Sequence, residues 1–186
     1  MGKRSLTHLP LKVLPVTIGM EVASPVGQGA DIQVHWRGGV AQRDRVVVVA
    51  TPSDRVAISS EYTAHGTPLL LRAPETVGEY WVQYRSFPSG QVMAQAPLSV
   101  VASEASLEFD SPQFAASTLQ VRFRGPNNHG DKIAILHRSK GKDRAISYRY
   151  SQQGSPVSLK LPDAPGGYRV AYLMKKGEIL AERQLT

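Results

Sequence analysis

The sequence of 186 residues contains no cysteine. This absence excludes a disulfide framework, a zinc site built from thiolates and a cysteine nucleophile. It leaves the compartment unknown, because a chain without thiols is indifferent to the redox potential around it. Long hydrophobic runs are also missing: none approaches the roughly 18 residues that a membrane-spanning helix needs. The first residues lack a continuous apolar segment with a small-residue cleavage site, so we identify no signal peptide.

Signatures of catalysis and of cofactor binding are missing as well. The sequence contains no Gly-x-Ser-x-Gly nucleophile motif and no Gly-x-Gly-x-x-Gly or Walker-type phosphate loop. None of the five histidines stands at a metal-ligand spacing from another. The loop "GPNNHGD" (125–131) is rich in polar atoms, but Asp131 is its one carboxylate, and calcium loops use several. We therefore predict a chain that is not an enzyme and that holds no cofactor and no metal ion.

Positive charge is present in excess and is unevenly placed. The net charge is +7. Residues 1–19 carry three basic side chains and no acid, residues 20–101 carry six arginines against seven acids, and residues 102–186 carry thirteen basic against eight acidic side chains. An excess on this scale aids solubility and favours polyanions weakly, without naming a partner.

The sequence repeats itself at an offset of 87 residues, the separation between Asp44 and Asp131. The stretch "IQVHWRG" meets "LQVRFRG", and the pattern Gly-x-Tyr-x-Val-x-Tyr occurs once in each copy. Because the period is long and each copy is complete, tandem domains are predicted, at residues 16–101 and 102–186. Residues 9–22 align at the same offset with residues 96–109, the end of the first copy. We therefore interpret the N-terminal segment 1–15 as a candidate closing strand of a lost preceding repeat.

Within each copy, apolar and polar residues alternate with a period of two. In "IQVHWRG" this places Ile32, Val34 and Trp36 on one face of a strand, and the second copy has Phe123 in the place of Trp36. Turn residues separate the apolar runs, and no amphipathic helix of useful length occurs. The pattern predicts an all-β chain of two tandem immunoglobulin-like antiparallel β-sandwich domains.

Each copy also has a tyrosine two residues after a glycine, Tyr80 in the first and Tyr168 in the second. This spacing is typical of the turn that leads into strand F of an immunoglobulin-like sandwich, where the ring is buried and the hydroxyl bonds a backbone group of the preceding corner. We therefore interpret Trp36, Tyr80, Phe123 and Tyr168 as a structural signature of the fold.

The densest charge cluster is the stretch "HRSKGKDRAISYRY" (137–150). Its basic residues are Arg138, Lys140, Lys142, Arg144 and Arg149. One hypothesis is a hairpin that binds a polyanion through these cations, with Tyr148 and Tyr150 as stacking partners. The alternative is a solvated hairpin whose charges discourage pairing between sheet edges. Ile146 shares the parity of the two tyrosines, which favours a place for all three in the core.

Trp81 lies beside Tyr80 and has the outward parity of its strand. An exposed tryptophan suits a contact surface, either with a neighbouring domain or with a ligand. The second copy has Arg169 at the corresponding position, so this contact is not part of the repeated design. We favour packing at a domain junction over ligand binding.

The motifs "VRFRGPNNHGDKIAI", "GSPVSLKLP", "GGYRVAY" and "ILAERQLT" resemble a bacterial tandem immunoglobulin-like repeat found in the C-terminal regions of von Willebrand factor A-domain proteins. The first copy departs from the pattern, with "GGVAQRD" in place of the Gly-Pro-Asn loop. The resemblance implies a non-catalytic accessory module beside a metal-dependent adhesion domain, in the envelope or outside the cell. The Asp-x-Ser-x-Ser metal motif of that domain is absent here, so the resemblance transfers no metal site.

These observations predict a tandem module for protein–protein binding or spacing in a bacterial envelope or surface assembly. The partner is expected to be another protein or an adjacent domain of a longer chain. The rival prediction is polyanion or carbohydrate binding through the basic second domain. The linker near residues 99–106 has neither glycine nor proline, so we expect little hinging between the domains.

Overall fold

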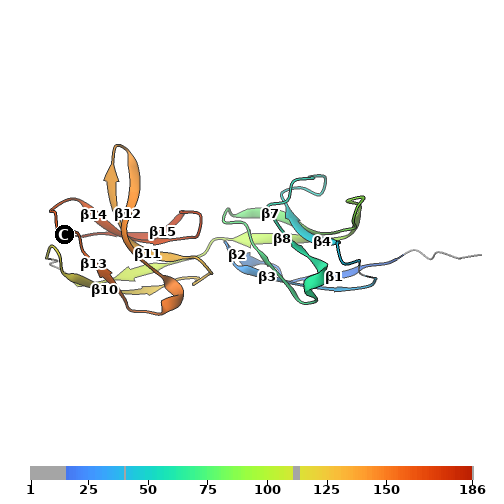
Figure 1. Ribbon diagram of the computed structural model, residues 1–186, viewed down its shortest axis with the longest axis horizontal. Coiled ribbons are helices and arrows are strands. Elements are labelled where there is room, and N and C mark those ends of the chain that lie inside the picture. The colour runs from blue at the N-terminus through green and yellow to red at the C-terminus, as the bar shows by residue number, and fades with distance from the viewer. Residues whose placement is uncertain (1–15, 40, 111–113, 186) are drawn as a thin grey trace, which may run out of the picture.

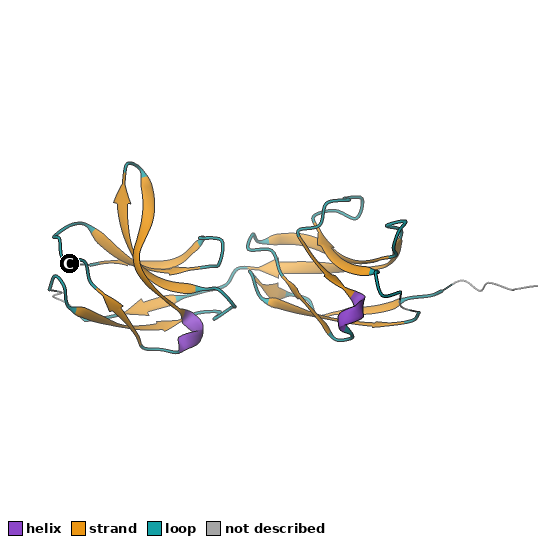
Figure 2. Cartoon of the chain, viewed as in Figure 1, coloured by secondary structure: helices purple, strands orange, loops and turns teal. Residues whose placement is uncertain are grey.

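The computed structural model describes residues 16–39, 41–110 and 114–185. It confirms the predicted fold class: the chain forms two tandem immunoglobulin-like β-sandwiches that follow each other end to end (Figure 1), and strands dominate both (Figure 2). The helices within the described residues are two single 3₁₀ turns, η1 (Thr63–His65) and η2 (Ser151–Gln153). The expected closing strand of a lost repeat, residues 1–15, lies outside the described residues.

The first sandwich has a three-stranded sheet in the order β1-β3-β6 and a five-stranded sheet in the order β2-β8-β7-β4-β5. Pro25 separates β1 from β2, and because proline has no N–H for a sheet ladder, the chain leaves one sheet here and joins the other. The short β2 runs parallel to β8, and the remaining pairs are antiparallel. The strands are β1 (Gly19–Val22), β2 (Val26–Gly27), β3 (Asp31–Arg37), β4 (Arg45–Val49), β5 (Ser59–Tyr62), β6 (Leu69–Arg72), β7 (Gly78–Arg85) and β8 (Val92–Val101).

The second sandwich has a three-stranded sheet in the order β13-β10-β9 and a four-stranded sheet in the order β12-β11-β14-β15, all antiparallel. The strands that carry the repeated tyrosines, β7 and β14, occupy matching positions next to the last strand of each sandwich. The strands are β9 (Ser106–Glu108), β10 (Thr118–Arg124), β11 (Lys132–Ser139), β12 (Lys142–Tyr150), β13 (Val157–Lys160), β14 (Tyr168–Leu173) and β15 (Ile179–Gln184).

Each sandwich has its own hydrophobic core, and the two clusters share no residue. Strand β3 alternates exposed and buried positions, and Ile32, Val34 and Trp36 belong to the first core. In β10 Val121 is fully buried, whereas Phe123 packs against the second core and stays partly exposed. Full burial of an apolar side chain such as that of Val121 stabilises the fold by roughly 1.5–3 kcal/mol. The alternation in the sequence therefore supplies much of the energy that holds the sheets together.

The two corner tyrosines make the same local hydrogen bond. The hydroxyl of Tyr80 donates to the backbone oxygen of Thr76 at 3.0 Å, and that of Tyr168 donates to the backbone oxygen of Ala164 at 3.1 Å. Both rings pack against their cores. Because each bond reaches back four residues, it ties the start of the strand to the turn before it.

The sandwiches differ most in the connection after β4 and its counterpart β11. In the first sandwich, residues 50–58 fold back over the sheet: the amide of Gln83 donates to the backbone oxygen of Pro52 at 2.8 Å. In the second, β11 and β12 continue to pair up to Ser139 and Lys142, with a bulge beside Ile135. The result is a long hairpin that projects from the sandwich (Figure 1).

Candidate functional site

The first of two buried tyrosine–aspartate pairs lies in the first sandwich. The hydroxyl of Tyr84 donates to Oδ2 of Asp44 at 2.9 Å, and Oδ1 of Asp44 accepts the backbone N–H of Phe87 at 2.8 Å. Burial raises the pKa of Tyr84 to about 12, and the bond to the carboxylate acts in the same direction. The ring also meets Trp36 edge-on, with centroids 6.3 Å apart. The pair therefore links the turn after residue 38 to strand β7.

The second sandwich repeats this pair with Tyr172 and Asp131. The hydroxyl of Tyr172 donates to Oδ2 of Asp131 at 3.1 Å and accepts the backbone N–H of Asn127 at 2.8 Å. Burial raises the pKa of Tyr172 to about 12. Burial also raises the pKa of Asp131, although the hydrogen bonds it accepts act in the opposite direction. A Cβ on Gly125 would lie 2.5 Å from the Tyr172 ring, so only glycine fits there.

Shifted pKa values often mark catalytic groups, but these pairs have structural geometry. Tyr84 is 1% exposed, and Tyr172 and Asp131 are 0% exposed, so a substrate does not reach them. Each hydroxyl bridges a turn to the core of its own sandwich. We conclude that the pairs brace the fold, which explains why Asp44 and Asp131 occur in both copies.

The structure also shows a polar joint between the sandwiches, centred on Gln28. Its Nε2 donates to the backbone oxygen of Glu75 at 2.6 Å and to Oε1 of Glu178 at 3.1 Å. Its Oε1 accepts the backbone N–H of Ser103 at 3.1 Å, and its backbone oxygen accepts Nδ2 of Asn128 at 3.0 Å. Gln28 is buried, so one side chain connects the first sandwich, the linker and the second sandwich.

Further contacts extend this joint. Both carboxylate oxygens of Glu75 accept the backbone N–H of Lys176, at 3.2 and 3.1 Å. Nη2 of Arg72 lies 3.9 Å from Oδ1 of the buried Asp131. A Cβ on Gly29 would lie 2.9 Å from the end of the buried Met174, so the chains approach closely here. Sequence reasoning missed the joint, because its partners lie far apart along the chain and carry no motif.

The five cations of the predicted polyanion-binding cluster lie on the projecting hairpin. Arg138 and Lys140 are on its outgoing side, and Lys142, Arg144 and Arg149 are on β12. All five are exposed. The neighbouring Asp143 pairs with Arg169 at 2.6 Å rather than with one of them. The hairpin therefore presents its cations to solvent along an edge strand.

The tyrosines of this hairpin are not core residues. Ile146, Tyr148 and Tyr150 are 47%, 44% and 43% exposed, so the expectation from their shared parity is wrong. Tyr148 pairs with Ala134 and Tyr150 with Lys132, so both rings lie on the face of the four-stranded sheet opposite to Ile133 and Ile135, which belong to the second core. Lys132 extends over both rings, 5.0 Å from the centre of Tyr148 and 5.7 Å from that of Tyr150. The cation holds the two rings together on the outside of the sheet.

Trp81 lies in β7, on the face of the five-stranded sheet that points away from the core. It stands opposite Val49 on one side and Pro97 on the other. Its side chain is half-buried. None of the contacts between the sandwiches described above involves Trp81, so the preferred role at a domain junction stays a prediction.

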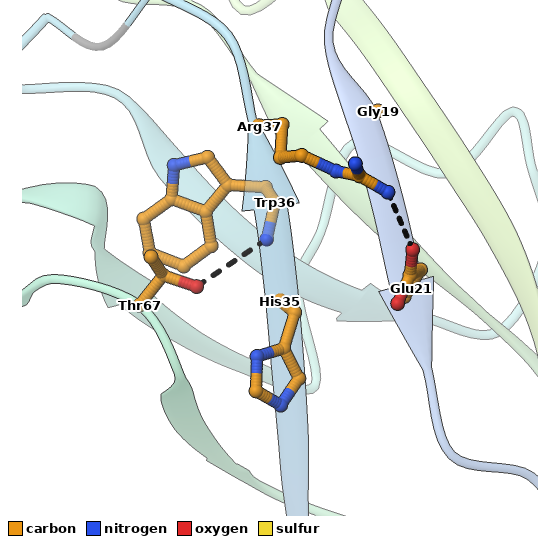
Figure 3. A pocket seen from close by; sticks show the side chains of 6 residues that line it. All are labelled: Gly19, Glu21, His35, Trp36, Arg37 and Thr67. Atoms are coloured by element: carbon orange, nitrogen blue, oxygen red, sulfur yellow. Dashed lines mark hydrogen bonds and ion pairs between the residues drawn. The ribbon is translucent and has the colours of Figure 1, made fainter.

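A cavity of about 340 Å³ lies along β1 and β3 (Figure 3). Arg37 and Trp36 leave β3 in opposite directions, and the guanidinium of Arg37 reaches Glu21 on β1 at 3.0 Å. Both side chains of this ion pair are largely exposed. Such a pair contributes on the order of 0–1 kcal/mol. His35 stands opposite Glu21 in the pairing of β1 with β3, and among the described contacts no hydrogen bond joins the two side chains.

Among residues 16–39, 41–110 and 114–185, no cluster of three or more His, Asp or Glu side chains could hold a metal ion. Within the same residues, no helix has the length and hydrophobicity to cross a membrane.

Comparison with known proteins finds likeness at the level of solved structures. No protein-family model matches the chain, and no curated protein does. A biofilm-associated protein BSP domain aligns with 91% of this chain at 11% identity, with a TM-score of 0.37. A marsupial T cell receptor aligns with 92% at 12% identity and a TM-score of 0.33, and a segment of two fibronectin type III domains from chicken tenascin aligns with 89% at 16% identity and a TM-score of 0.33.

The chain spans 29% of the biofilm-associated protein, 70% of the T cell receptor and 95% of the tenascin segment. Identity and TM-scores of this size assign neither family nor function. The class of the protein follows from its own topology: two successive sandwiches, each with a three-stranded sheet facing a larger one. This arrangement places the chain among tandem immunoglobulin-like and fibronectin-like β-sandwich proteins.

Proposed function

We propose that this chain is a non-catalytic module that binds a protein partner and holds a fixed spacing in a bacterial envelope or surface assembly. The observation that carries the proposal is the polar joint around Gln28. The resemblance of the second copy to a bacterial immunoglobulin-like repeat supports the setting and the association with a von Willebrand factor A domain. A fold of rigid sheets and exposed loops is suited to presentation of a binding surface.

The joint supports a spacing role because its polar groups are costly to separate. Domains joined by a linker move relative to each other unless their interface holds them. Here Gln28, Glu75 and Asp131 are all at least nine-tenths buried. Opening the joint would exchange the hydrogen bonds that Gln28 and Glu75 make across it for bonds to water, at a net cost of about 0.5–1.5 kcal/mol for each bond. The sandwiches should therefore keep one relative orientation.

The binding role rests on what the second sandwich exposes. The hairpin of β11 and β12 projects beyond the sheet (Figure 1) and carries arginines beside two exposed tyrosines. Tyrosine and arginine are enriched at protein interfaces, because they combine a large contact area with hydrogen bonds. A partner that packs on Tyr148 and Tyr150 would cover a surface that the chain itself leaves open.

The distance between the two sandwiches can be measured by pulsed electron–electron double resonance between two spin labels. Since the chain has no cysteine, Ala64→Cys and Lys160→Cys place one spin label in each sandwich. Both residues are exposed and lie in regular elements. We expect one narrow distance distribution for the parent chain. Glu75→Ala removes the acceptors of the Lys176 N–H and should broaden it.

The matched control is Glu79→Ala, which removes an exposed carboxylate on β7 that bonds Ser99 within the same sandwich. It should leave the distribution narrow. A parent distribution as broad as that of Glu75→Ala would refute the spacing role. A narrow distribution in all three proteins would show that the joint around Glu75 is not what holds the sandwiches.

A second candidate function is polyanion or carbohydrate binding through the basic second domain. The observation in its favour is that the five hairpin cations are exposed. Retention on a heparin column tests it, at two salt concentrations, with Lys142→Ala/Arg144→Ala as the variant. Two results would support this function: weaker retention of the variant than of the parent, and earlier elution of the parent at the higher salt concentration. Equal retention of parent and variant would exclude it.

A further inference from the structure

A cavity of about 380 Å³ lies on the outer face of the five-stranded sheet in the first sandwich. Four arginines line it: Arg43, Arg45, Arg55 and Arg85. They are four of the six arginines in residues 20–101, a stretch that contains seven acidic residues. The fold therefore gathers positive charge in the half of the chain where a count along the sequence shows no excess.

No carboxylate lines this cavity. Asp44, between Arg43 and Arg45 in the sequence, points inward and accepts the Tyr84 hydroxyl and the backbone N–H of Phe87. Among the described residues, none of the four guanidinium groups forms an ion pair with an acid. Within the described part of the chain their charges thus have no ion-pair partner, and an anionic ligand would supply one.

Arg85 gives the cavity a fixed wall. Its Nε and Nη2 donate to Oε1 of Gln83 at 3.0 and 2.7 Å, and its Nη1 donates to the backbone oxygen of Arg55 at 2.8 Å. Nη2 also bonds the backbone oxygen of Asp54. These acceptors are neutral, so Arg85 keeps its full charge while it positions the loop that carries Arg55. Gln83 is 0% exposed, so the wall is anchored in the protein interior.

Aromatic rings hold two other guanidinium groups. Arg43 lies over the ring of Phe87 at 4.7 Å; Arg45 lies over the ring of Tyr62 at 4.3 Å, and its Nη2 also donates to the Tyr62 hydroxyl. Stacking restrains the planes and leaves N–H edges for an acceptor, the geometry that suits bidentate binding of oxyanions. An arginine covers one face of each ring, which reduces the aromatic surface on which nucleic-acid bases could stack. The site therefore favours an anion without an aromatic group.

We propose that this cavity binds the sulfate or phosphate ester groups of an acidic saccharide. Guanidinium forks pair bidentately with such groups, and the hydroxyls of Ser60 and Ser86, which also line the cavity, provide neutral partners for sugar hydroxyls. The volume lies at the small end of the roughly 300–1,000 Å³ of ligand pockets. This site goes beyond the proposed spacing and protein-binding function, and it lies in the first sandwich rather than on the basic hairpin of the second.

Isothermal titration of the full chain with a heparin-derived tetrasaccharide tests the proposal. Arg43→Ala/Arg55→Ala should weaken binding by at least about tenfold, since each charge-assisted bond contributes at least that much. The control, Arg122→Ala/Arg124→Ala, removes two exposed positive charges from β10 of the second sandwich, away from both the cavity and the basic hairpin, and should change affinity less than about twofold. If the alanine variant does not fold, Arg43→Lys/Arg55→Lys keeps the charges, removes the forks and should still weaken binding.

Three outcomes would overturn the proposal. The first is an equal loss of affinity in the pocket variant and in the Arg122→Ala/Arg124→Ala control, which would indicate general charge attraction. The second is inorganic phosphate binding as tightly as the tetrasaccharide, which would indicate a site for the free ion. The third is tighter binding of a single-stranded oligonucleotide of equal charge, with the same loss in the pocket variant.

Discussion

Replacing Tyr84 with phenylalanine separates the hydrogen bond of the buried pair from its packing. The ring stays against Trp36, and only the hydroxyl that donates to Asp44 is removed. A buried bond to a charged group contributes about 1.5–3 kcal/mol. Asp44 keeps the backbone N–H groups of Phe87 and Ala41, so the carboxylate is not left without donors. We therefore expect Tyr84→Phe to lower the free energy of unfolding by about 1.5–2 kcal/mol at neutral pH.

The pH dependence gives this prediction its sharper form. The pKa of Tyr84 rises from 10.0 in the unfolded chain to about 12 in the fold, chiefly through burial. The neutral tyrosine is thus favoured by folding, and its stabilising contribution is complete below pH 10 and is lost as the pH rises through 12. Two pKa units correspond to about 2.7 kcal/mol. Phenylalanine has no proton to lose, so the variant keeps its stability while the parent loses its advantage between pH 10 and 12.

Fluorescence during urea unfolding isolates the relevant sandwich, because the two tryptophans of the chain, Trp36 and Trp81, both lie in the first one. The measurement compares parent and variant from pH 7 to 11.5. Tyr172→Phe, the equivalent change in the second sandwich, is the control and should leave this fluorescence transition nearly unchanged. A stability difference that stays constant across the whole pH range would refute the reasoning.

Three further predictions concern single positions. Burial raises the pKa of Asp131 above 3.8, so the protonated carboxyl stabilises the fold at low pH. The parent loses this contribution as the pH rises through the folded pKa. Asp131→Asn should therefore lose less stability than the parent between pH 4 and pH 7. Urea unfolding at both pH values measures it. Trp36→Ala should destabilise the first sandwich by about 3–5 kcal/mol through the cavity it leaves, as measured by calorimetry. Tyr168→Phe should cost about 1 kcal/mol and lower the melting temperature of the second sandwich by about 4–8 °C.

Each of these has a clear contrary result. An Asp131→Asn chain with the same pH dependence as the parent would show that the buried carboxyl is not the group that titrates. A loss below about 1 kcal/mol for Trp36→Ala, where about 3–5 is expected, would mean that the first core closes around the missing ring. An unchanged melting temperature for Tyr168→Phe would mean that the hydroxyl bond to Ala164 does not brace the corner.

Much of the architecture could be predicted from the sequence because it depends on local order. The alternation around Ile32, Val34 and Trp36 defines a strand with one buried face, and the repeat shows that the same fold occurs twice. The partners of the corner tyrosines, Thr76 and Ala164, lie four residues upstream, so a short motif contains the whole interaction. These features depend on periodicity and turn spacing within a short segment, so they can be predicted without knowing which segments pack against it.

The candidate surfaces could be predicted only in part. The basic hairpin was visible as a run of charges, but parity alone could not tell whether Tyr148 and Tyr150 face the core or the solvent. The answer depends on which face of the four-stranded sheet packs on the second core. Tyr148 and Tyr150 pair with Ala134 and Lys132 on the opposite face, where Lys132 also lies over both rings. A period of two shows which residues share a face of the strand, but it does not show which face is buried. That depends on how the strand packs in the sheet, not on the segment itself.

By itself, the sequence determined an all-β repeat with two cores and the corner bonds of its tyrosines, because those features follow from residues a few positions apart. The tertiary structure alone decided that Gln28 meets Glu178, 150 residues away, and that Arg43, Arg45 and Arg85 surround one cavity. Strand pairing and the approach of two sandwiches bring such residues together. Their spacing along the chain carries no period, so only the folded chain reveals the joint and the arginine cavity.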